Sequence, residues 1–157
     1  MSDDKKLKNA QNVYKTLCEM MDEKQLKYDK YPEDLVITFV MSGEDIPMQF
    51  VLNIDADREL IRLISPLPVT FEGDKRVDGA IATCHANYRI ADGSFDFDYK
   101  KGKILFRMTS SYMDSLISKD LFEYMVAIAC YTVDEYNDKF LMLSKGLLTV
   151  EQLFEKK

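Results

Sequence analysis

The amino-acid sequence predicts an α+β fold in which helices pack on one antiparallel sheet. Some segments repeat apolar residues at three- and four-residue steps, as helices do, and others repeat them at every second residue, as half-buried strands do. Short turn signals join the strand segments, and 157 residues suit one ordinary domain. We therefore expect the order α-βββ-α-ββ-α with five strands in a single domain, 1–157, comprising a core of about 4–145 and a short C-terminal helix of about 149–156.

The first expected helix runs from about Lys5 to Lys24. Ser2, Asp3 or Asp4 can cap its start, and acidic residues there suit the helix dipole. Five apolar residues mark one face at helical spacing: Leu7, Ala10, Tyr14, Leu17 and Met21.

Three strands are expected next, over residues 35–41, 46–54 and 59–67. The middle segment alternates apolar and polar residues, which indicates a half-buried strand. Pro66 and Pro68 cannot donate hydrogen bonds to a neighbouring strand, so the third strand is expected to finish at a sheet edge. The short connections predict an antiparallel meander.

A second helix is expected to begin at an Asp74 cap and to run to about Tyr88. Gly79 in its interior costs about 1 kcal/mol relative to alanine, which indicates close packing there. Its apolar stripe consists of Val77, Ile81, Cys84 and Tyr88.

A hairpin follows, with strands over 95–99 and 104–108 joined by residues 100–103. Aromatic residues alternate with aspartates in its first strand. One register places aromatic residues on one face and charges on the other: Tyr99 opposite Ile104, Phe97 opposite Phe106 and Asp96 opposite Arg107.

A long last helix is expected from about Lys119 to Lys145, with Ser118 as its N-cap and Gly146 as its terminator. Its first half is apolar nearly all round, which is typical of a helix packed on two sides. The sequence 149–152 fits a capping box and opens a short helix that carries Leu153 and Phe154.

Composition excludes several classes of function. The chain has 21 Lys plus Arg against 27 Asp plus Glu, a net charge of −6, so a general nucleic-acid role is not expected. A single His excludes multi-histidine metal sites. Three widely spaced cysteines (Cys18, Cys84, Cys130) suit reduced, buried thiols.

The expected location is the cytoplasm. The N-terminal stretch has no apolar run of the kind that a secretory signal needs. The longest apolar-rich stretch, Leu121 to Val133, is shorter than the roughly 18 residues needed to span a bilayer. No membrane association is expected.

Two groups of residues invite a chemical hypothesis. Cys84-His85 resembles a nucleophile–base pair, but adjacent residues on a helix point about 100° apart, so packing for Cys84 and a capping or surface role for His85 are favoured. Asp96 and Asp98 share one strand face, yet alternation with aromatic residues and a neighbouring Arg107 explain them. We therefore expect no catalytic, cofactor-binding or metal-binding residues; the three Cys and one His lack the short spacing of zinc sites.

The segment from Asn87 to Asp98 and the segment from Gly102 to Arg107 carry a family resemblance. They resemble the Asn, Gly-x-Phe and hairpin region of the YbjN-type proposed sensory transduction regulators of bacteria, which share the fold of type III secretion chaperones. The residues that carry the motif, with an expected structural role, are Asn87, Gly93, Phe95, Phe97 and Arg107. The resemblance implies a protein that dimerises and holds an extended segment of a client protein against apolar patches and sheet edges.

The resulting hypothesis is a non-enzymatic protein-binding module, chaperone-like or regulatory, that acts as a homodimer with an unidentified protein partner. It rests on the acidic charge, the two-sided apolar helix and the resemblance. The resemblance makes the second helix and the hairpin candidates for the dimer surface. Two alternatives stay open: a small-molecule-binding or enzymatic domain that uses the Asp96/Asp98 face or the Cys84-His85 region, and a structural dimerisation unit within a larger complex.

Overall fold

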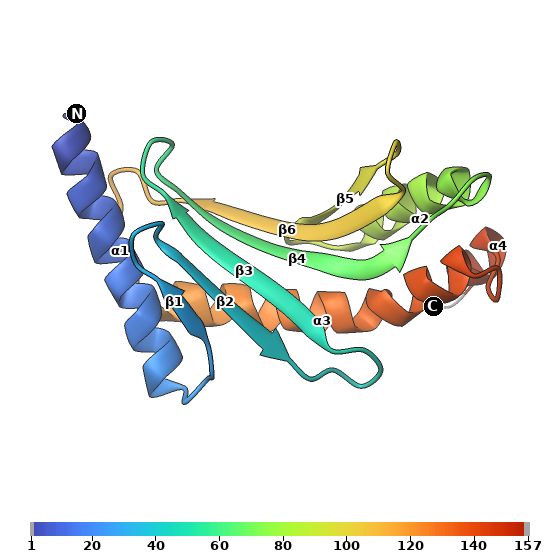
Figure 1. Ribbon diagram of the computed structural model, residues 1–157, viewed down its shortest axis with the longest axis horizontal. Helices are drawn as coiled ribbons and strands as arrows, with labels where there is room; N and C mark the ends of the chain where they lie inside the picture. Colours follow the sequence, from blue (N-terminus) through green and yellow to red (C-terminus); the bar gives the residue numbers. More distant parts are fainter. Residues whose placement is uncertain (1, 156–157) are drawn as a thin grey trace.

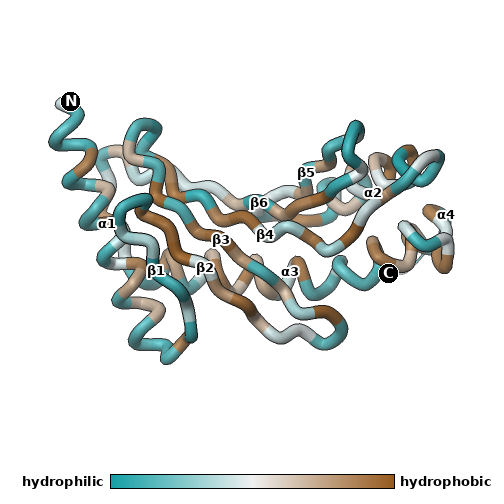
Figure 2. The backbone as a smooth tube through the Cα atoms, in the orientation of Figure 1, coloured by the Kyte–Doolittle hydropathy of each residue, from teal (hydrophilic) through white to brown (hydrophobic). Residues whose placement is uncertain are grey.

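A computed structural model, which describes residues 2–155, confirms the α+β class. Within those residues, one antiparallel sheet has six strands in the order β1-β2-β3-β4-β6-β5. The long helix α3 runs along the sheet, α1 crosses at one end, and α2 and α4 lie at the other end (Figure 1). Apolar residues recur along strands β2, β3 and β4 (Figure 2).

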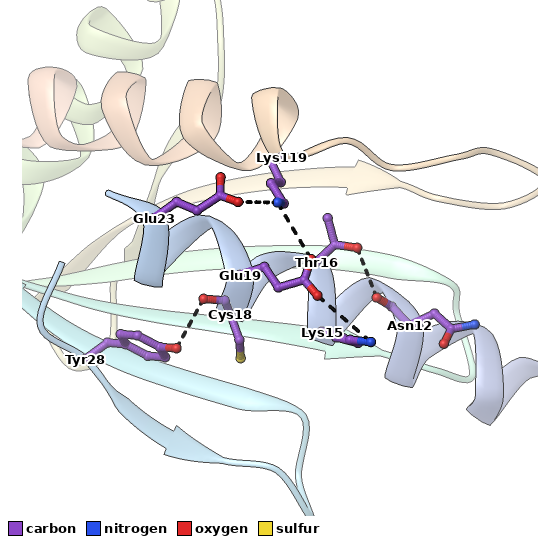
Figure 3. A network of polar contacts seen from close by, with 8 residues as sticks. All are labelled: Asn12, Lys15, Thr16, Cys18, Glu19, Glu23, Tyr28 and Lys119. Atoms are coloured by element: carbon purple, nitrogen blue, oxygen red, sulfur yellow. Dashed lines mark hydrogen bonds and ion pairs between the residues drawn. The ribbon is translucent and has the colours of Figure 1, made fainter. Parts of the chain in front are cut away.

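Helix α1 spans Asp3–Glu23 and buries the predicted face except Leu7, which is 48% exposed. Ser2 is its N-cap residue but makes no side-chain capping bond. Charged residues tie α1 to α3, because the Lys119 ammonium bridges the carboxylates of Glu19 and Glu23 (Figure 3).

The sheet has one strand more than the predicted five. Strand β1, Asp29–Tyr31, pairs with β2, Val36–Met41. All three β1 residues are exposed, so the strand lacks the alternation of burial on which the sequence prediction depended. The chain reverses between the two strands through Leu35, which has a φ of 55°.

Strand β3 spans Met48–Asp55 and β4 spans Leu60–Thr70. The predicted edge position of β4 is wrong, because β4 lies between β3 and β6. The prolines are tolerated for a different reason: the pairing of β4 with β3 stops at Ile64, before Pro66. A bulge between Pro66 and Thr70 interrupts the pairing with β6.

Helix α2 spans Lys75–Arg89, as expected in length, but Asp74 does not cap it. Asp74 has helical backbone angles, and its carboxylate accepts no hydrogen bond from the first-turn N–H groups. The predicted close packing at Gly79 is confirmed, since a Cβ there would lie 2.9 Å from the rings of Phe71 and Phe97.

The hairpin consists of β5, Ser94–Asp98, and β6, Lys103–Ser111, with a register that differs from the prediction. Phe106 faces Phe95 rather than Phe97, and Ile104 faces Phe97 rather than Tyr99. The shift arises because Tyr99 belongs to the turn. That turn closes through a hydrogen bond from the Gly102 N–H to the Asp98 carbonyl, 2.7 Å long.

Helix α3 spans Lys119–Ser144 and α4 spans Val150–Glu155. The predicted Ser118 cap is confirmed, since its hydroxyl accepts a bond from the Leu121 N–H. The capping box is also confirmed, because Thr149 and Gln152 exchange two hydrogen bonds of 2.9 and 3.2 Å. The predicted residue 156 of this last helix lies outside the described residues.

Helix α3 packs on the sheet and on two helices, but its first half is not covered all round as predicted, since Tyr124 is 48% and Tyr131 69% exposed. The helix contacts strands β3, β4 and β6 as well as helices α1 and α2. Its Tyr136 and Phe140 pack with Phe95 and Phe106 in an aromatic cluster at ring distances of 5.1 to 5.9 Å. None of the described helices combines the length and the apolar character needed to cross a bilayer.

Candidate protein-binding surfaces

Helix α2 presents its large apolar side chains to solvent. Val77 is 50% exposed, Ile81 44% and Tyr88 91%, and Cys84 between them is exposed too. An apolar helical stripe ordinarily faces the core. We call this surface, made of Val77, Ile81, Cys84 and Tyr88, the α2 stripe. The exposure of Cys84 on this surface contradicts the packing role in the protein interior that was expected for it.

The opposite side of α2 explains the orientation. The buried residues on that side are small: Gly79, Ala82, Thr83 and Ala86. The Thr83 hydroxyl donates a hydrogen bond to the Gly79 carbonyl at 2.7 Å. These small side chains let the helix approach the rings of Phe71 and Phe97 closely. Larger side chains would not fit there, so the α2 stripe remains outside.

The hairpin lies beside α2 at the same end of the molecule (Figure 1). Phe97 is half-buried and packs edge-on against Phe71, with ring centroids 5.6 Å apart. Tyr99 in the turn is 55% exposed and contacts Phe97. The two elements expected to form a dimer surface are therefore adjacent.

The outer edge of β5 is closed by a side chain of α2. The Asn87 amide accepts a hydrogen bond from the Phe95 N–H, 2.7 Å, and donates one to the Phe95 carbonyl, 2.9 Å. This imitates a neighbouring strand. Gly93 just before the strand has a φ of 75°, and a Cβ there would lie 2.8 Å from Met108. An added strand would find the backbone of Phe95 already occupied.

The other edge of the sheet is open beyond β1. The Ile54 N–H donates to the Leu35 carbonyl at 3.0 Å, so these two opposite residues form a hydrogen-bonded pair. Hydrogen-bonded and non-hydrogen-bonded pairs alternate along antiparallel strands. Thr38 and Val40 therefore direct their backbone groups away from β3. Asp29 pairs with Thr38, but β1 supplies no residue opposite Val40. The Val40 side chain is 61% exposed.

A groove of about 530 Å³ adjoins this open edge. Residues from the β1 side and from β2 and β3 line it, including Tyr28, Phe39 and Phe50. Phe39 and Phe50 stack with ring centroids 5.1 Å apart. Phe39 and Phe50 are themselves buried, 4% and 1% exposed. The open strand edge is a site at which an extended peptide is able to bind by strand addition, chiefly through main-chain hydrogen bonds.

The Cys84-His85 region does not form a catalytic pair. Cys84 lies on the α2 stripe, while the His85 ring packs on the Phe154 ring with centroids 3.9 Å apart. Burial and, to a smaller degree, the nearby Arg89 charge lower the pKa of His85. Burial raises the pKa of the Cys18 thiol, and it raises that of Cys130 to about 11. Those two thiols stay protonated near neutral pH.

The Asp96/Asp98 face is occupied by local contacts. Asp96 pairs with the Arg107 guanidinium at 2.7 Å, so Arg107 is the expected neighbour, but it lies opposite Ser94 and not opposite Asp96 as the predicted register had it. The Asp98 carboxylate accepts a bond from the Lys101 N–H in the turn. Within residues 2–155, His, Cys, Asp and Glu side chains form no group of three that could hold a metal ion.

Three solved structures have a similar fold. The ExsC–ExsE complex matches with a TM-score of 0.59 and 17% identity, over 83% of this chain and 94% of that one. YbjN from E. coli, a proposed transcription regulator, matches with a TM-score of 0.59 and 9% identity, over 80% and 89%. The HopA1–SchA chaperone–effector complex matches with 0.54 and 14%, over 82% and 95%.

These matches confirm, at the level of the fold, the resemblance read from the hairpin region. No protein-family model matches the chain, and no curated protein sequence matches it significantly. At such low identities the likeness establishes the fold alone.

Proposed function

We propose that this chain is a non-enzymatic protein-binding module, chaperone-like or regulatory, that works as a cytoplasmic homodimer built from a single domain. The observation that carries the proposal is the α2 stripe, in which large apolar side chains face solvent while small ones face the core. Neighbours of the same fold include a chaperone–effector complex, which supports a role in binding proteins. Free thiols at Cys18, Cys84 and Cys130 suit a reducing compartment.

The α2 stripe suits self-association. A contiguous apolar surface at helical spacing marks a protein interface. In a two-fold dimer the same surface on each copy faces its equivalent, so one helix is enough to supply both halves. The adjoining Tyr99 in the hairpin extends this surface with a further exposed ring.

Ile81→Asp is expected to convert the dimer to a monomer. A carboxylate on both copies would be buried near the two-fold axis, where an unpaired charge is strongly unfavourable. We expect the dimer dissociation constant to rise at least about 100-fold, equivalent to roughly 2.7 kcal/mol. Sedimentation equilibrium across micromolar concentrations measures it.

Leu116→Asp is the matched control for that experiment. Leu116 is fully exposed in the connection between β6 and α3, at the end of the molecule opposite α2 (Figure 1). It should leave the association unchanged. A wild-type chain that sediments as a monomer at about 100 μM would contradict the dimer. That concentration corresponds to an association free energy of roughly −5.5 kcal/mol.

The open edge at Val40 suits the partner protein. An extended client segment added there would gain main-chain hydrogen bonds from Val40 and side-chain contacts with the more exposed groove residues Tyr28, Gln49 and Val51. The Asn87 contacts already occupy the opposite sheet edge at Phe95. We therefore assign the client to the β2 side of the sheet.

Val40→Pro is expected to weaken client binding at least about tenfold while the fold persists. Proline removes the N–H that an added strand would use, and β1 has no residue opposite this position. The client is first recovered by affinity purification from the native cell and then titrated against both chains by calorimetry.

Val40→Thr controls for the side chain, because it keeps the N–H and the β-branched shape. It should bind the client nearly as well as the wild type does. Equal loss of affinity in the proline and threonine variants would place recognition in the side chain, against strand addition. Circular dichroism verifies that both variants remain folded.

A further inference from the structure

The outward side of α3 is a further apolar surface, separate from the α2 stripe and the open edge. Tyr124, Ile128 and Tyr131 recur at four- and three-residue steps, the spacing of one helical face. Tyr124 is 48% and Tyr131 69% exposed, and Ile128 between them is half-buried. We call this surface, made of these three residues, the α3 face. We propose that the α3 face binds a basic segment of a partner protein, with an arginine or lysine side chain beside Tyr131.

The α3 face lies opposite the side of α3 that packs in the core. Successive residues are about 100° apart around a helix, so Tyr124 and Tyr131 point roughly away from the buried Ala129 and Val133. The sequence predicted that the first half of α3 is packed on two sides. The α3 face is the part of that apolar surface which the structure leaves exposed.

A cavity of about 230 Å³ lies beside Tyr131, between α3 and the connection from α2 to β5. Apolar side chains form much of its lining, including Ile90, Ala91 and Ile128. A cavity of about 150 Å³ is enough to hold a benzene ring, so this one has room for the end of a long side chain. The α3 face therefore combines exposed rings with a space that an anchoring side chain is able to enter.

The charges around the cavity favour a cationic side chain. Asp92 and Glu135 both line the cavity, and within residues 2–155 no ion pair engages either carboxylate. Asp92 accepts a hydrogen bond from the Tyr124 hydroxyl, which leaves its negative charge in place. The cation in the lining is Arg89, which has an interaction of its own. Two carboxylates against one cation leave an excess of negative charge, so an acidic segment is disfavoured there.

The Tyr131 ring attracts the same cation. A lysine or arginine within about 6 Å of a tyrosine ring centre is attracted by the negative face of the ring. An arginine also pairs its N–H groups with a carboxylate such as that of Glu135. Tyr124 lies about 10 Å from Tyr131 along the helix. A segment anchored in the cavity therefore reaches Ile128 and Tyr124 with its neighbouring apolar side chains.

A library of random short peptides displayed on phage supplies the probe for this face. The library is selected on the full chain and counter-selected on a variant that carries both Tyr131→Ala and Glu135→Gln. We expect the peptides that require these two residues to be enriched in arginine and lysine relative to the library. The most strongly selected peptide is then synthesised and titrated against each chain by calorimetry.

Tyr131→Ala and Glu135→Gln should each raise the dissociation constant of that peptide about fivefold or more, as expected for loss of the ring or of the charge. Tyr131→Phe keeps the ring and should bind nearly as well as the wild type. Tyr31→Ala is the matched control, because Tyr31 is 48% exposed in β1, on a different surface, and the constant should not change. Thermal unfolding verifies that each variant folds.

Three results overturn the proposal. The selection yields no peptide whose binding depends on Tyr131 and Glu135, or the dependent peptides lack basic residues. Alternatively, Tyr131→Ala weakens self-association in sedimentation, which would assign the α3 face to a second copy of the chain. The peptide titrations involve neither the α2 stripe nor Val40, so the dimer and the client edge are tested separately by their own variants.

Discussion

Replacing Gly102 by alanine is expected to lower the free energy of unfolding by about 3 kcal/mol or more. Gly102 has a φ of 66°, and a Cβ there would overlap the Phe71 carbonyl oxygen and lie 2.9 Å from its carbon. The Phe71 N–H donates to the Gly102 carbonyl at 2.8 Å, so the two backbones are already joined. The Phe71 backbone cannot move aside as the end of a flexible side chain can. Urea unfolding followed by circular dichroism measures the loss.

Gly73→Ala separates the two contributions. Gly73 has a similar φ of 55°, but no heavy atom lies within 4 Å of the position a Cβ would take. It should lose only the roughly 1 kcal/mol of a left-handed residue. Equal losses in the two variants would mean that the approach of Gly102 to Phe71 contributes nothing.

The Phe71–Gly102 contact also bears on the proposed dimer. It joins the end of β4, just before α2, to the hairpin turn that carries Tyr99. Displacing it should move α2 relative to the hairpin. We therefore expect Gly102→Ala to weaken dimerisation as well, while Gly73→Ala should not.

Most elements were predictable because their signals are local. The helical spacing from Leu7 to Met21, the Ser118 cap and the capping box at Thr149 each depend on residues within one or two turns. Strand β1 was not predictable in this way. It consists of exposed residues that pair with β2, so pairing rather than burial makes it a strand.

The orientation of α2 shows where periodicity fails. A stripe of large apolar residues identifies a face of the helix but does not say what covers it. The available signal was on the other side, where Gly79, Ala82 and Ala86 recur at helical spacing. Small residues at helical spacing identify the face of a helix that packs closely on its neighbours, just as an apolar stripe ordinarily identifies it. The outward-facing stripe is then left for another molecule.

The candidate sites depend on contacts between distant segments. Val40 is open only because β1 begins at Asp29, and the groove beside it exists only where residues 27–29, 38–40 and 49–51 meet. Neither fact follows from a spacing in the sequence. The hairpin register likewise depended on whether Tyr99 belonged to the strand or to the turn.

Asn87→Ala is expected to lower the free energy of unfolding by about 2–4 kcal/mol, because both backbone groups of Phe95 lose their partner. Phe95 is 1% exposed, so water has little access to those groups. Asn53→Ala provides the matched control: its amide makes one long bond, 3.5 Å, to the Asp34 carbonyl in an exposed setting. That variant should lose less than about 1 kcal/mol.

Asn87→Asp tests the donor half of the bridge. The introduced carboxylate still accepts from the Phe95 N–H but faces the Phe95 carbonyl without a proton to donate. Repulsion disfavours its charged form in the folded chain, so its pKa should rise above the ordinary value of about 3.9. The protonated carboxyl regains the donor, so the stabilisation is complete below about pH 3.9 and is lost as the pH rises through the folded-state pKa. As the pH is lowered from about 7 to about 4, near the ordinary pKa of an aspartate, the free energy of unfolding of Asn87→Asp should therefore rise relative to that of Asn87→Ala. Urea unfolding at each pH measures both. Parallel pH profiles for the two variants would show that Asn87 acts through packing, and the β5 edge would then be closed by the helix alone.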